Sequence, residues 1–541
     1  MKRQQKKIYL KHILTVGLTL CGILPSVGAQ EFNEGITGSK STDEIYVTTG
    51  VLKDGKYTFT EDTKIHVNNH SKNAVFYKEV NESEGQKSKI WIMAGISSRN
   101  GKVNIDAKGK ELTVGLGYEK PKENESPIEW PAGIYVSGGK SITIDAKRVR
   151  LYNAYGGKMY GGDIYFDSKD SDRKLTITGD LDLTGERNGR VELDDGELKI
   201  GGNYKGGHIA NNTSAWYGKI VIGGNADIQE SNSRNLRRRY KPVGLEARDI
   251  SVGGNVNIKL NSESYDSVPD WDSYDRAIGI ECRGKFQIGG NIVMRNQDAD
   301  HPWGIYVPYL KNPIFSTDGS MGIHYSGYDG GLIKGDLDLM LRTRTGILVD
   351  PEWYKHDGNR GKFYLAGNVK IEMYPYLRVY ESIHPYAPLI AIYNNSHMDV
   401  AVNMGQDGKQ PGNKNVQIDG NIKLFGASLA NNPSGAEYSI PKVTLALTNK
   451  DSHWTGVSFL TGRYEPEVVL PEPASFNLYL RNGARWNNRK HGAIQRNESS
   501  IKGYTFSGSE VTRFYGGLNQ EGRGIVHMHD TAPLTIGEYE G

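Results

Sequence analysis

The residues best suited to chemistry lie in three stretches that mix acidic and aromatic side chains, at 261–276, 296–303 and 350–360. Aromatic rings beside hydrogen-bonding groups suit contacts with sugars or with protein surfaces. The predicted binding contacts are Asp270, Trp271, Asp272, Tyr274, Trp303, Trp353 and Tyr354. The alternative is that these stretches are solvated loop tips without a ligand. Their composition leaves both interpretations open.

Metal binding is a second chemistry that the sequence suggests. Four aspartates between Asp266 and Asp275 supply the carboxylate oxygens that calcium prefers, but their spacing matches no standard calcium loop. His527 and His529 fall on one face of a short predicted strand, without a third ligand near them in the sequence. We therefore expect solvent-exposed side chains at both places and no bound cofactor.

Hydrolytic chemistry would need motifs that the sequence lacks. It contains no Gly-x-Ser-x-Gly segment and no His-Glu-x-x-His segment. Carbohydrate-active β-helix enzymes use paired carboxylates that converge on one groove, or an acidic calcium site with a basic residue. Spacing alone identifies no such set here. The sequence therefore predicts a protein that is not an enzyme, with a polysaccharide lyase or glycoside hydrolase as the alternative.

The first 29 residues have the pattern of a secretory signal peptide. Basic residues come first, an apolar run from Ile13 to Val27 follows, and a small residue, Ala29, ends the segment. About fifteen apolar residues are too few to span a bilayer comfortably, so we expect cleavage after Ala29. No later stretch is apolar enough for a transmembrane helix. These features predict export to the bacterial cell surface, in the outer membrane or outside the cell.

Composition excludes other classes of protein. Lys and Arg total 66 and Asp and Glu total 63, so the net charge of +3 predicts no binding to nucleic acid or to an anionic membrane. Cys282 is the single cysteine after the predicted cleavage site, which rules out an internal disulfide and predicts a small buried core residue. Stability must therefore come from packing and hydrogen bonding alone.

One phrase recurs eight times along the chain. It consists of alternating apolar residues, a Gly followed by Asn or Asp, and a second alternating stretch, as from Ile250 to Ile258. The central glycines are Gly179, Gly202, Gly224, Gly254, Gly290, Gly335, Gly367 and Gly420. The alternation predicts two short strands with one buried face each. We expect the glycine to permit a positive φ at a corner between them.

The central glycines are 23, 22, 30, 36, 45, 32 and 53 residues apart. The shortest spacings match one coil of a β-solenoid. The longer ones match a coil with an inserted loop, and the spacings of 45 and 53 also allow an extra degenerate coil. A propeller would need even spacings of roughly 40–50 residues. We predict an all-β, right-handed parallel β-helix with irregular loop insertions.

A second phrase, a short strand begun by Gly, is interleaved with the first. Its glycines directly follow Ala94, Ala132, Val243, Ile278, Trp303 and Thr345. Each copy predicts a further short strand, so one coil should contain three strands joined by turns. Insertions of variable length on such a coil are surface loops, and binding is expected there.

The last hundred residues contain different phrases. They are Trp454-Thr-Gly456, Phe476 to Asn487, Gly524 to Met528 and Pro533 to Gly541. In this order they resemble the end of the passenger region of a bacterial type V autotransporter, and the Gly-Asn coils resemble the same passengers. The resemblance implies an adhesin-like surface β-helix that continues into a membrane β-barrel. Because the sequence stops within the last phrase, we expect a fragment that lacks the barrel.

These patterns predict three parts: a signal peptide at 1–29, a β-helix passenger at 30–445 and C-terminal β-helix coils at 446–541. The expected function is that of an adhesin or interaction protein. Its expected partner is a host-surface or matrix protein or a glycan. A rigid scaffold that sums many weak contacts along its length suits this role.

Overall fold

A computed structural model describes much of the chain after residue 36. The described residues are 37–41, 44–49, 52–53, 55–68, 75–81, 87–98, 101–118, 130–137, 140–155, 158–167, 172–193, 195–210, 218–230, 243–260, 278–296, 321–327, 330–341, 345–350, 361–373, 389–405, 408–425, 440–461, 474–491, 508–517, 522–529 and 533–541. They form β-strands and no helix, so this part of the chain contains no helix that could span a membrane. The predicted signal peptide at 1–29 lies outside the described residues.

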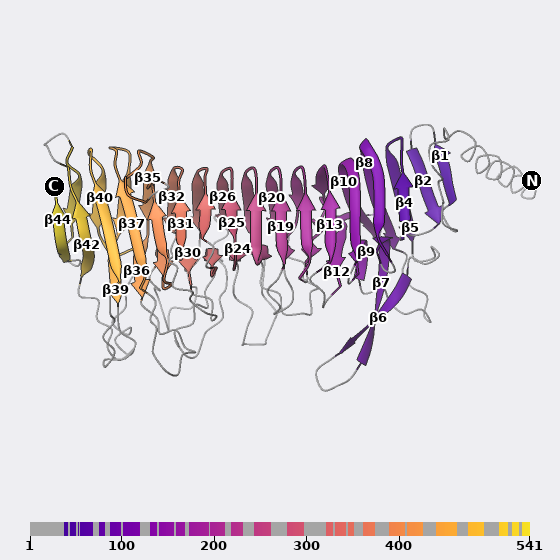
Figure 1. Ribbon diagram of the computed structural model, residues 1–541, viewed down its shortest axis with the longest axis horizontal. Coiled ribbons are helices and arrows are strands. Elements are labelled where there is room, and N and C mark those ends of the chain that lie inside the picture. The colour runs from indigo at the N-terminus through magenta and orange to yellow at the C-terminus, as the bar shows by residue number, and fades with distance from the viewer. Residues whose placement is uncertain are drawn as a thin grey trace, which may run out of the picture. The chain divides into compact units, whose positions relative to one another are not determined.

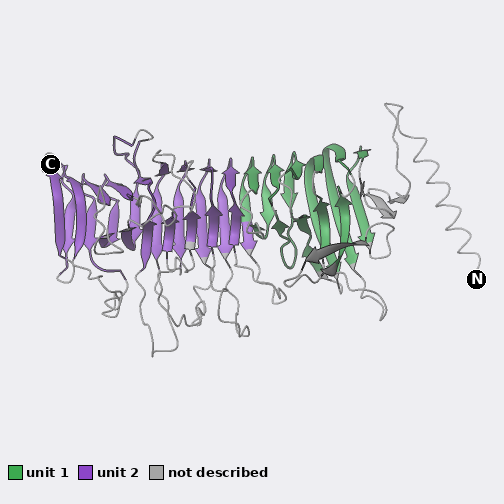
Figure 2. Cartoon of the chain, turned by 60° about the horizontal axis from the view of Figure 1, so that its bottom comes forward, with its two compact units in different colours: residues 1–227 green, residues 228–541 purple. Residues whose placement is uncertain are grey.

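The chain divides into two compact units, residues 1–227 and residues 228–541 (Figure 2). In both units the chain passes repeatedly through three short strands. Each strand pairs in parallel with its counterpart one coil later, which makes three ladders (Figure 1). The predicted parallel β-helix with three strands per coil is therefore confirmed.

Unit 1 begins with an antiparallel pair, β1 (Thr37–Ser41) and β2 (Glu44–Thr49). Its first ladder contains β4 (Gly55–Thr58), β13 (Lys174–Ile177), β16 (Glu197–Ile200) and β19 (Lys219–Ile222). Its second ladder contains β5 (Thr63–Asn68), β14 (Asp180–Asp182) and β17 (Tyr204–Gly206). The long strands β8 (Val103–Tyr118) and β10 (Ser141–Tyr155) belong to both ladders, because β10 pairs with β13 and with β14.

The third ladder of unit 1 contains β3 (Leu52–Lys53), β7 (Lys87–Ser97), β9 (Trp130–Val136), β12 (Asp163–Phe166), β15 (Val191–Glu192) and β18 (Ile209–Ala210). Two strands of unit 1 pair antiparallel with a neighbour: β6 (Val75–Asn81) with β7 of the third ladder, and β11 (Lys158–Gly161) with β10 of the other two ladders. The strand β20 (Ala226–Glu230) spans the boundary between the two units.

Unit 2 repeats the arrangement over more coils. The first ladder contains β22 (Asp249–Val252), β25 (Phe286–Ile288), β28 (Gly331–Ile333), β31 (Lys362–Leu365), β34 (Asp399–Val402), β37 (Lys442–Leu447), β40 (Ser475–Leu480), β42 (Ser509–Tyr515) and β44 (Leu534–Glu540). The second contains β23 (Val256–Leu260), β26 (Ile292–Asn296), β29 (Leu337–Leu341), β32 (Val369–Met373), β35 (Val416–Asp419), β38 (His453–Gly456), β41 (Arg485–Asn488) and β43 (Ile525–Met528). The third contains β21 (Val243–Ala247), β24 (Ile278–Cys282), β27 (Met321–Tyr325), β30 (Thr345–Val349), β33 (Ile390–Asn394), β36 (Asn421–Phe425) and β39 (Ser458–Thr461).

The core of unit 2 is built from side chains that repeat at the same register position in successive coils. Ile280, Ile323 and Ile347 align in the third ladder and are fully buried. Phe286 stacks on Phe363 with ring centroids 5.8 Å apart. Each fully buried side chain of this size contributes roughly 1.5–3 kcal/mol through the hydrophobic effect. Cys282 is buried and free, as predicted.

Asparagine and aspartate side chains join successive coils at the corner between the first and second strands. In unit 2, Oδ1 of Asn255 accepts the backbone N–H of Asn291 at 2.8 Å, and Oδ1 of Asn291 accepts that of Asp336 at 2.8 Å. Asp336 accepts the N–H of Asn368 in the same way. Since each side chain satisfies a backbone donor one coil later, the Gly-Asn phrase keeps neighbouring corners in register.

The reason that we expected for the corner glycines holds for Gly420, whose φ is 157°, and is wrong for the other seven. Gly202 and Gly290, for example, do not have positive φ angles. Instead, the corners approach so closely that a Cβ at Gly290 would lie 2.5 Å from Oδ1 of Asn255 and 2.6 Å from the carbonyl carbon of Gly254. A Cβ at Gly202 would lie 2.3 Å from Oδ1 of Asp180. Glycine is required by close stacking of backbone on backbone.

The eighth copy of the phrase does not occupy the position of the others. Its first half forms β35, which pairs with β32 in the second ladder, and its second half forms β36 in the third ladder. Gly420 therefore stands at a different corner. The Asn ladder continues through Asn415, whose N–H donates to Oδ1 of Asn368 at 2.9 Å. The same alternation and Gly-Asn pair can thus serve either corner.

The strand expected at residues 303–307 lies outside the described residues. The third strand of that coil is β27, which pairs with β24 and with β30. Because β25 pairs directly with β28, the spacing of 45 residues contains one coil and no extra one. The Gly phrase at Met321 was missed because its apolar character is weaker than that of the copy at Trp303.

Candidate functional site

The seven predicted contacts lie outside the described residues, but the strands that flank them are described. Asp270, Trp271, Asp272, Tyr274, Trp303, Trp353 and Tyr354 are the residues concerned. The first four lie in the sequence between β23 and β24, Trp303 lies between β26 and β27, and the last two follow β30. The strands β24, β27 and β30 are consecutive members of the third ladder, so the three stretches join the third strands of three neighbouring coils.

One row of side chains in this ladder faces away from the core. Side chains alternate along a strand, and Ile280 and Cys282 point inward, so Glu281 points outward. The register places Glu281, His324 and Leu348 opposite one another. The outer row consists of Glu246, Glu281, His324, Leu348, Tyr393, Lys423 and Phe459.

Four charged or titratable side chains meet within the outer row and beside it. Arg283 donates from its terminal guanidinium nitrogen to Oε1 of Glu281 at 2.7 Å. His324 lies between two carboxylates, with Nδ1 3.6 Å from Oε1 of Glu281 and Nε2 3.9 Å from Oδ2 of Asp350. The row therefore joins three coils through alternating acidic and basic groups.

The members of this cluster differ in their access to solvent. Glu281 is 1% exposed, whereas the side chains of His324 and Asp350 are 16% and 22% exposed. Burial raises the pKa of Asp350, and the nearby His324 and a hydrogen bond from Asn395 only partly oppose it. A carboxylate as buried as Glu281 needs its Arg283 partner, because an unpaired buried charge costs several kcal/mol.

Unit 1 carries a related cluster in its own third ladder. Arg190 places Nε 3.2 Å from Oε1 of Glu192 and 3.7 Å from Oδ2 of Asp163. Nε2 of His208 lies 3.6 Å from the same oxygen of Glu192. The hydroxyl of Tyr165 donates to Oδ2 of Asp163 at 3.1 Å. Burial raises the pKa of Asp163 despite the adjacent guanidinium.

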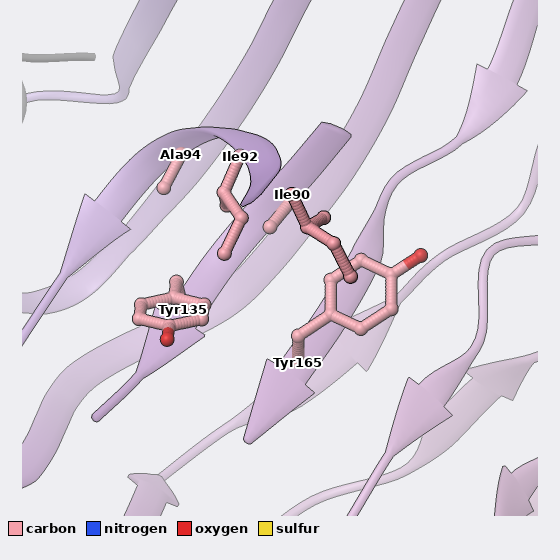
Figure 3. Packing of buried hydrophobic residues seen from close by; sticks show 6 residues of the cluster. Ile90, Ile92, Ala94, Tyr135 and Tyr165 are labelled. Atoms are coloured by element: carbon pink, nitrogen blue, oxygen red, sulfur yellow. The ribbon is translucent and has the colours of Figure 1, made fainter. Parts of the chain in front are cut away.

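Apolar side chains continue this face of unit 1. Tyr165 and Tyr135 are opposite one another in the register and are both buried. They form a cluster with Ile90, Ile92 and Ala94 of β7 (Figure 3). The outward face of the third ladder therefore carries buried side chains in unit 1, as it does at Glu281 and Leu348 in unit 2, whereas a strand face exposed to water would be polar.

No family model, curated protein or solved structure matches this chain.

The described residues offer no site for a metal ion. They contain no group of three His, Cys, Asp or Glu side chains arranged to hold one. His527 and His529 are both exposed, and β43 ends at Met528, so only His527 belongs to the strand. The aspartates around Asp270 lie outside the described residues, so calcium binding there stays an open alternative.

The charged clusters were not predicted from the sequence, although a signal for them exists. Glu246, Glu281 and His324 each stand two residues after the glycine of a Gly phrase. Aligning the phrases by that glycine would have placed these side chains in one outward row. Chemically, the cluster can hold neighbouring coils together through its ion pairs. Glu281 is too buried and too tightly paired to reach a polymer.

Proposed function

We propose that this protein is an exported interaction protein that binds a glycan or a protein through stretches carried on the third ladder of unit 2. One observation carries the proposal. The stretches with Asp270 to Tyr274, with Trp303, and with Trp353 and Tyr354 all join β24, β27 or β30, which are neighbours in register. Stacked strands are about 4.8 Å apart. Three stretches rich in aromatic and acidic residues are thus tethered to adjacent coils. Two of them attach at the N-terminal ends of β24 and β27, and the third attaches at the C-terminal end of β30.

The cellular setting is part of the same proposal. A signal-like start at 1–29, Gly-Asn coils and the C-terminal phrases support the passenger region of a type V autotransporter, displayed at the bacterial surface. Expression of the full chain in a Gram-negative host, followed by N-terminal sequencing of the exported protein, tests this setting. A mature N-terminus at Gln30 outside the inner membrane is expected. An uncleaved chain retained in the cytoplasm would contradict it.

The enzyme alternative draws on the cluster of Glu281, His324 and Asp350. A histidine with one carboxylate on each side is an arrangement that acid–base catalysis can use. However, glycoside hydrolysis needs both carboxyl groups to reach the bond that breaks, and Glu281 is paired with Arg283 and 1% exposed. The geometry therefore favours binding over catalysis.

The decisive experiment separates the two classes. The purified protein is screened against host-surface glycans, matrix proteins and acidic polysaccharides, with binding and product release measured in parallel. Binding without turnover, lost when residues 261–276 are replaced by a short Gly-Ser linker, is expected. Turnover that disappears in Asp270→Ala or Asp272→Ala, or in Asp350→Asn, would establish the enzyme instead.

A further inference from the structure

Arg481 differs from the other half-buried arginines of the described residues in having no acidic partner. It follows β40 directly, and its guanidinium carbon lies 5.3 Å from the ring centroid of Tyr479. Its Nε is buried and makes no hydrogen bond. A cation that is partly removed from water usually has a counter-charge, because desolvation is costly without one.

The comparison with similar arginines shows how unusual this is. Arg190, Arg283 and Arg295 are also half-buried, and each forms an ion pair with a carboxylate: Glu192 at 3.2 Å, Glu281 at 2.7 Å and Asp338, respectively. No ion pair of Arg481 exists within the part of the chain that the structure describes. The ring of Tyr479 supplies a cation–π contact, which offsets part of the desolvation but leaves the donors of the planar guanidinium fork available.

The surroundings of Arg481 supply further groups that can contact a ligand. Arg523 forms a backbone bridge with Arg481 and is exposed, so two guanidinium-bearing residues are adjacent. Tyr479 stacks on Tyr515 of the next coil, with centroids 4.2 Å apart and planes 9° apart. Both tyrosines are half-buried on the outward side of the first ladder.

Neither arginine forms an ion pair with an acidic side chain of the last coil. Glu538 forms an ion pair with Arg513 at 2.9 Å. Glu540 stands opposite Tyr515 in the register of β42 and β44, and its negative charge, after burial, helps to raise the pKa of Tyr479. Among the described residues, Arg481 and Arg523 therefore carry two positive charges without an ion pair, in a protein whose total charge is close to balanced.

We propose that Arg481 and Arg523, together with the Tyr479–Tyr515 pair, bind a carboxylate group of an acidic polysaccharide. The guanidinium fork matches a carboxylate in a bidentate geometry. Contact with the ring of Tyr479 limits the orientations of Arg481, so less entropy is lost on binding. The choice of a polysaccharide rests on the proposed binding function, and the choice of an anion rests on Arg481 itself. This site belongs to the first ladder and is separate from the stretches carried on the third.

The test uses the full chain and polygalacturonate as the probe, with neutral dextran as the matched polymer. Calorimetry at low ionic strength should give binding to polygalacturonate that weakens with added salt. Arg481→Gln should weaken the affinity for polygalacturonate at least tenfold. Arg481→Lys keeps the charge but loses the planar guanidinium fork, so its affinity should lie between those of the wild type and of Arg481→Gln. Arg150→Gln, at an exposed arginine of unit 1, is the control for loss of one positive charge and should change affinity less than twofold.

The outcomes separate this inference from the proposed function. If polygalacturonate binds and Arg481→Gln binds equally well with an unchanged melting temperature, the inference is wrong and the proposed function stands. An equal loss in Arg481→Gln and Arg150→Gln would show general charge attraction and would also overturn the site. If the protein binds dextran or a matrix protein but not polygalacturonate, the inference fails alone. If it binds nothing in the screen, both fail.

Discussion

Trp486 stacks on Trp454 in the core of unit 2, with ring centroids 4.7 Å apart and planes 7° apart. Each indole N–H also donates to a glycine carbonyl of the preceding coil, Gly420 at 2.9 Å and Gly456 at 3.0 Å. Both tryptophans are fully buried. The two coils therefore repeat a stacked ring and a hydrogen bond as one unit of packing.

Loss of this stack should destabilise unit 2. Trp454→Ala removes a large buried ring and is expected to cost about 3–5 kcal/mol. Trp454→Phe keeps a ring but leaves the carbonyl of Gly420 without its donor, at a cost of about 1–3 kcal/mol. Urea unfolding followed by fluorescence and circular dichroism measures both. Tyr539→Ala, at a side chain that is 66% exposed, serves as the control. Equal midpoints for all three variants would contradict the packing role.

The corner ladder should depend on a side-chain acceptor and not on asparagine as such. Asn255→Ala leaves the N–H of Asn291 without its acceptor and should cost about 1 kcal/mol. Asn255→Asp keeps the oxygen, as Asp336 does naturally for Asn368, and should be close to wild type. Amide hydrogen exchange at Asn291 is the direct readout, with faster exchange in the alanine variant alone. Similar exchange in both variants would refute the ladder.

Stability should depend on the protonation of Asp350. Burial raises the pKa of Asp350 in the folded protein above its ordinary value of 3.8. Between the two values the folded state binds more protons than the unfolded state, so this residue's contribution to stability falls as the pH rises. Asp350→Asn removes that contribution. The free energy of unfolding of wild type minus that of the variant, measured from pH 3.5 to pH 7, should decrease with pH. A flat or rising difference would contradict the shift.

The thiol of Cys282 should be inert in the folded protein. Burial raises its pKa to about 12, so almost no thiolate exists near neutral pH. A thiol reagent such as dithionitrobenzoate should not react at this position until urea unfolds unit 2. Cys282→Ser is the control, because subtracting its signal removes any contribution from Cys21. Rapid labelling of Cys282 in native protein would show that the coil opens easily.

The sequence predicts the fold of this chain better than it predicts the site. The alternation of apolar and polar residues on both sides of each Gly-Asn pair identifies the strands, because every coil buries the inward face of its three strands. The alternation cannot decide which corner a phrase occupies. Gly420 and Gly290 stand in copies of the same phrase but at different corners. Nor did the sequence pattern identify the Gly phrase at Met321, which forms the third strand of its coil.

The charged clusters are harder to predict because their members are far apart in sequence. Glu281 and His324 are 43 residues apart in the sequence. They are neighbours only because β24 pairs with β27, and the insertion between these strands hides that pairing in the sequence. Nothing in the distribution of charged residues along the sequence distinguishes Arg481 from other arginines. Its distinctive property is the absence of a carboxylate beside it in three dimensions within the described residues, which depends on the register of β40 and β42.

The unequal lengths of otherwise identical coils have a mechanical consequence. Within unit 2, Gly254 to Gly290 is 36 residues, Gly290 to Gly335 is 45 and Gly335 to Gly367 is 32. Neighbouring coils are joined by similar corner bonds, so a pulling force applied at one end would peel coils off in turn at comparable loads. Each released coil lengthens the tether by roughly 3.3–3.6 Å per residue. Single-molecule stretching should therefore record force peaks of similar height at unequal intervals, and the order of those intervals would identify the end at which peeling begins.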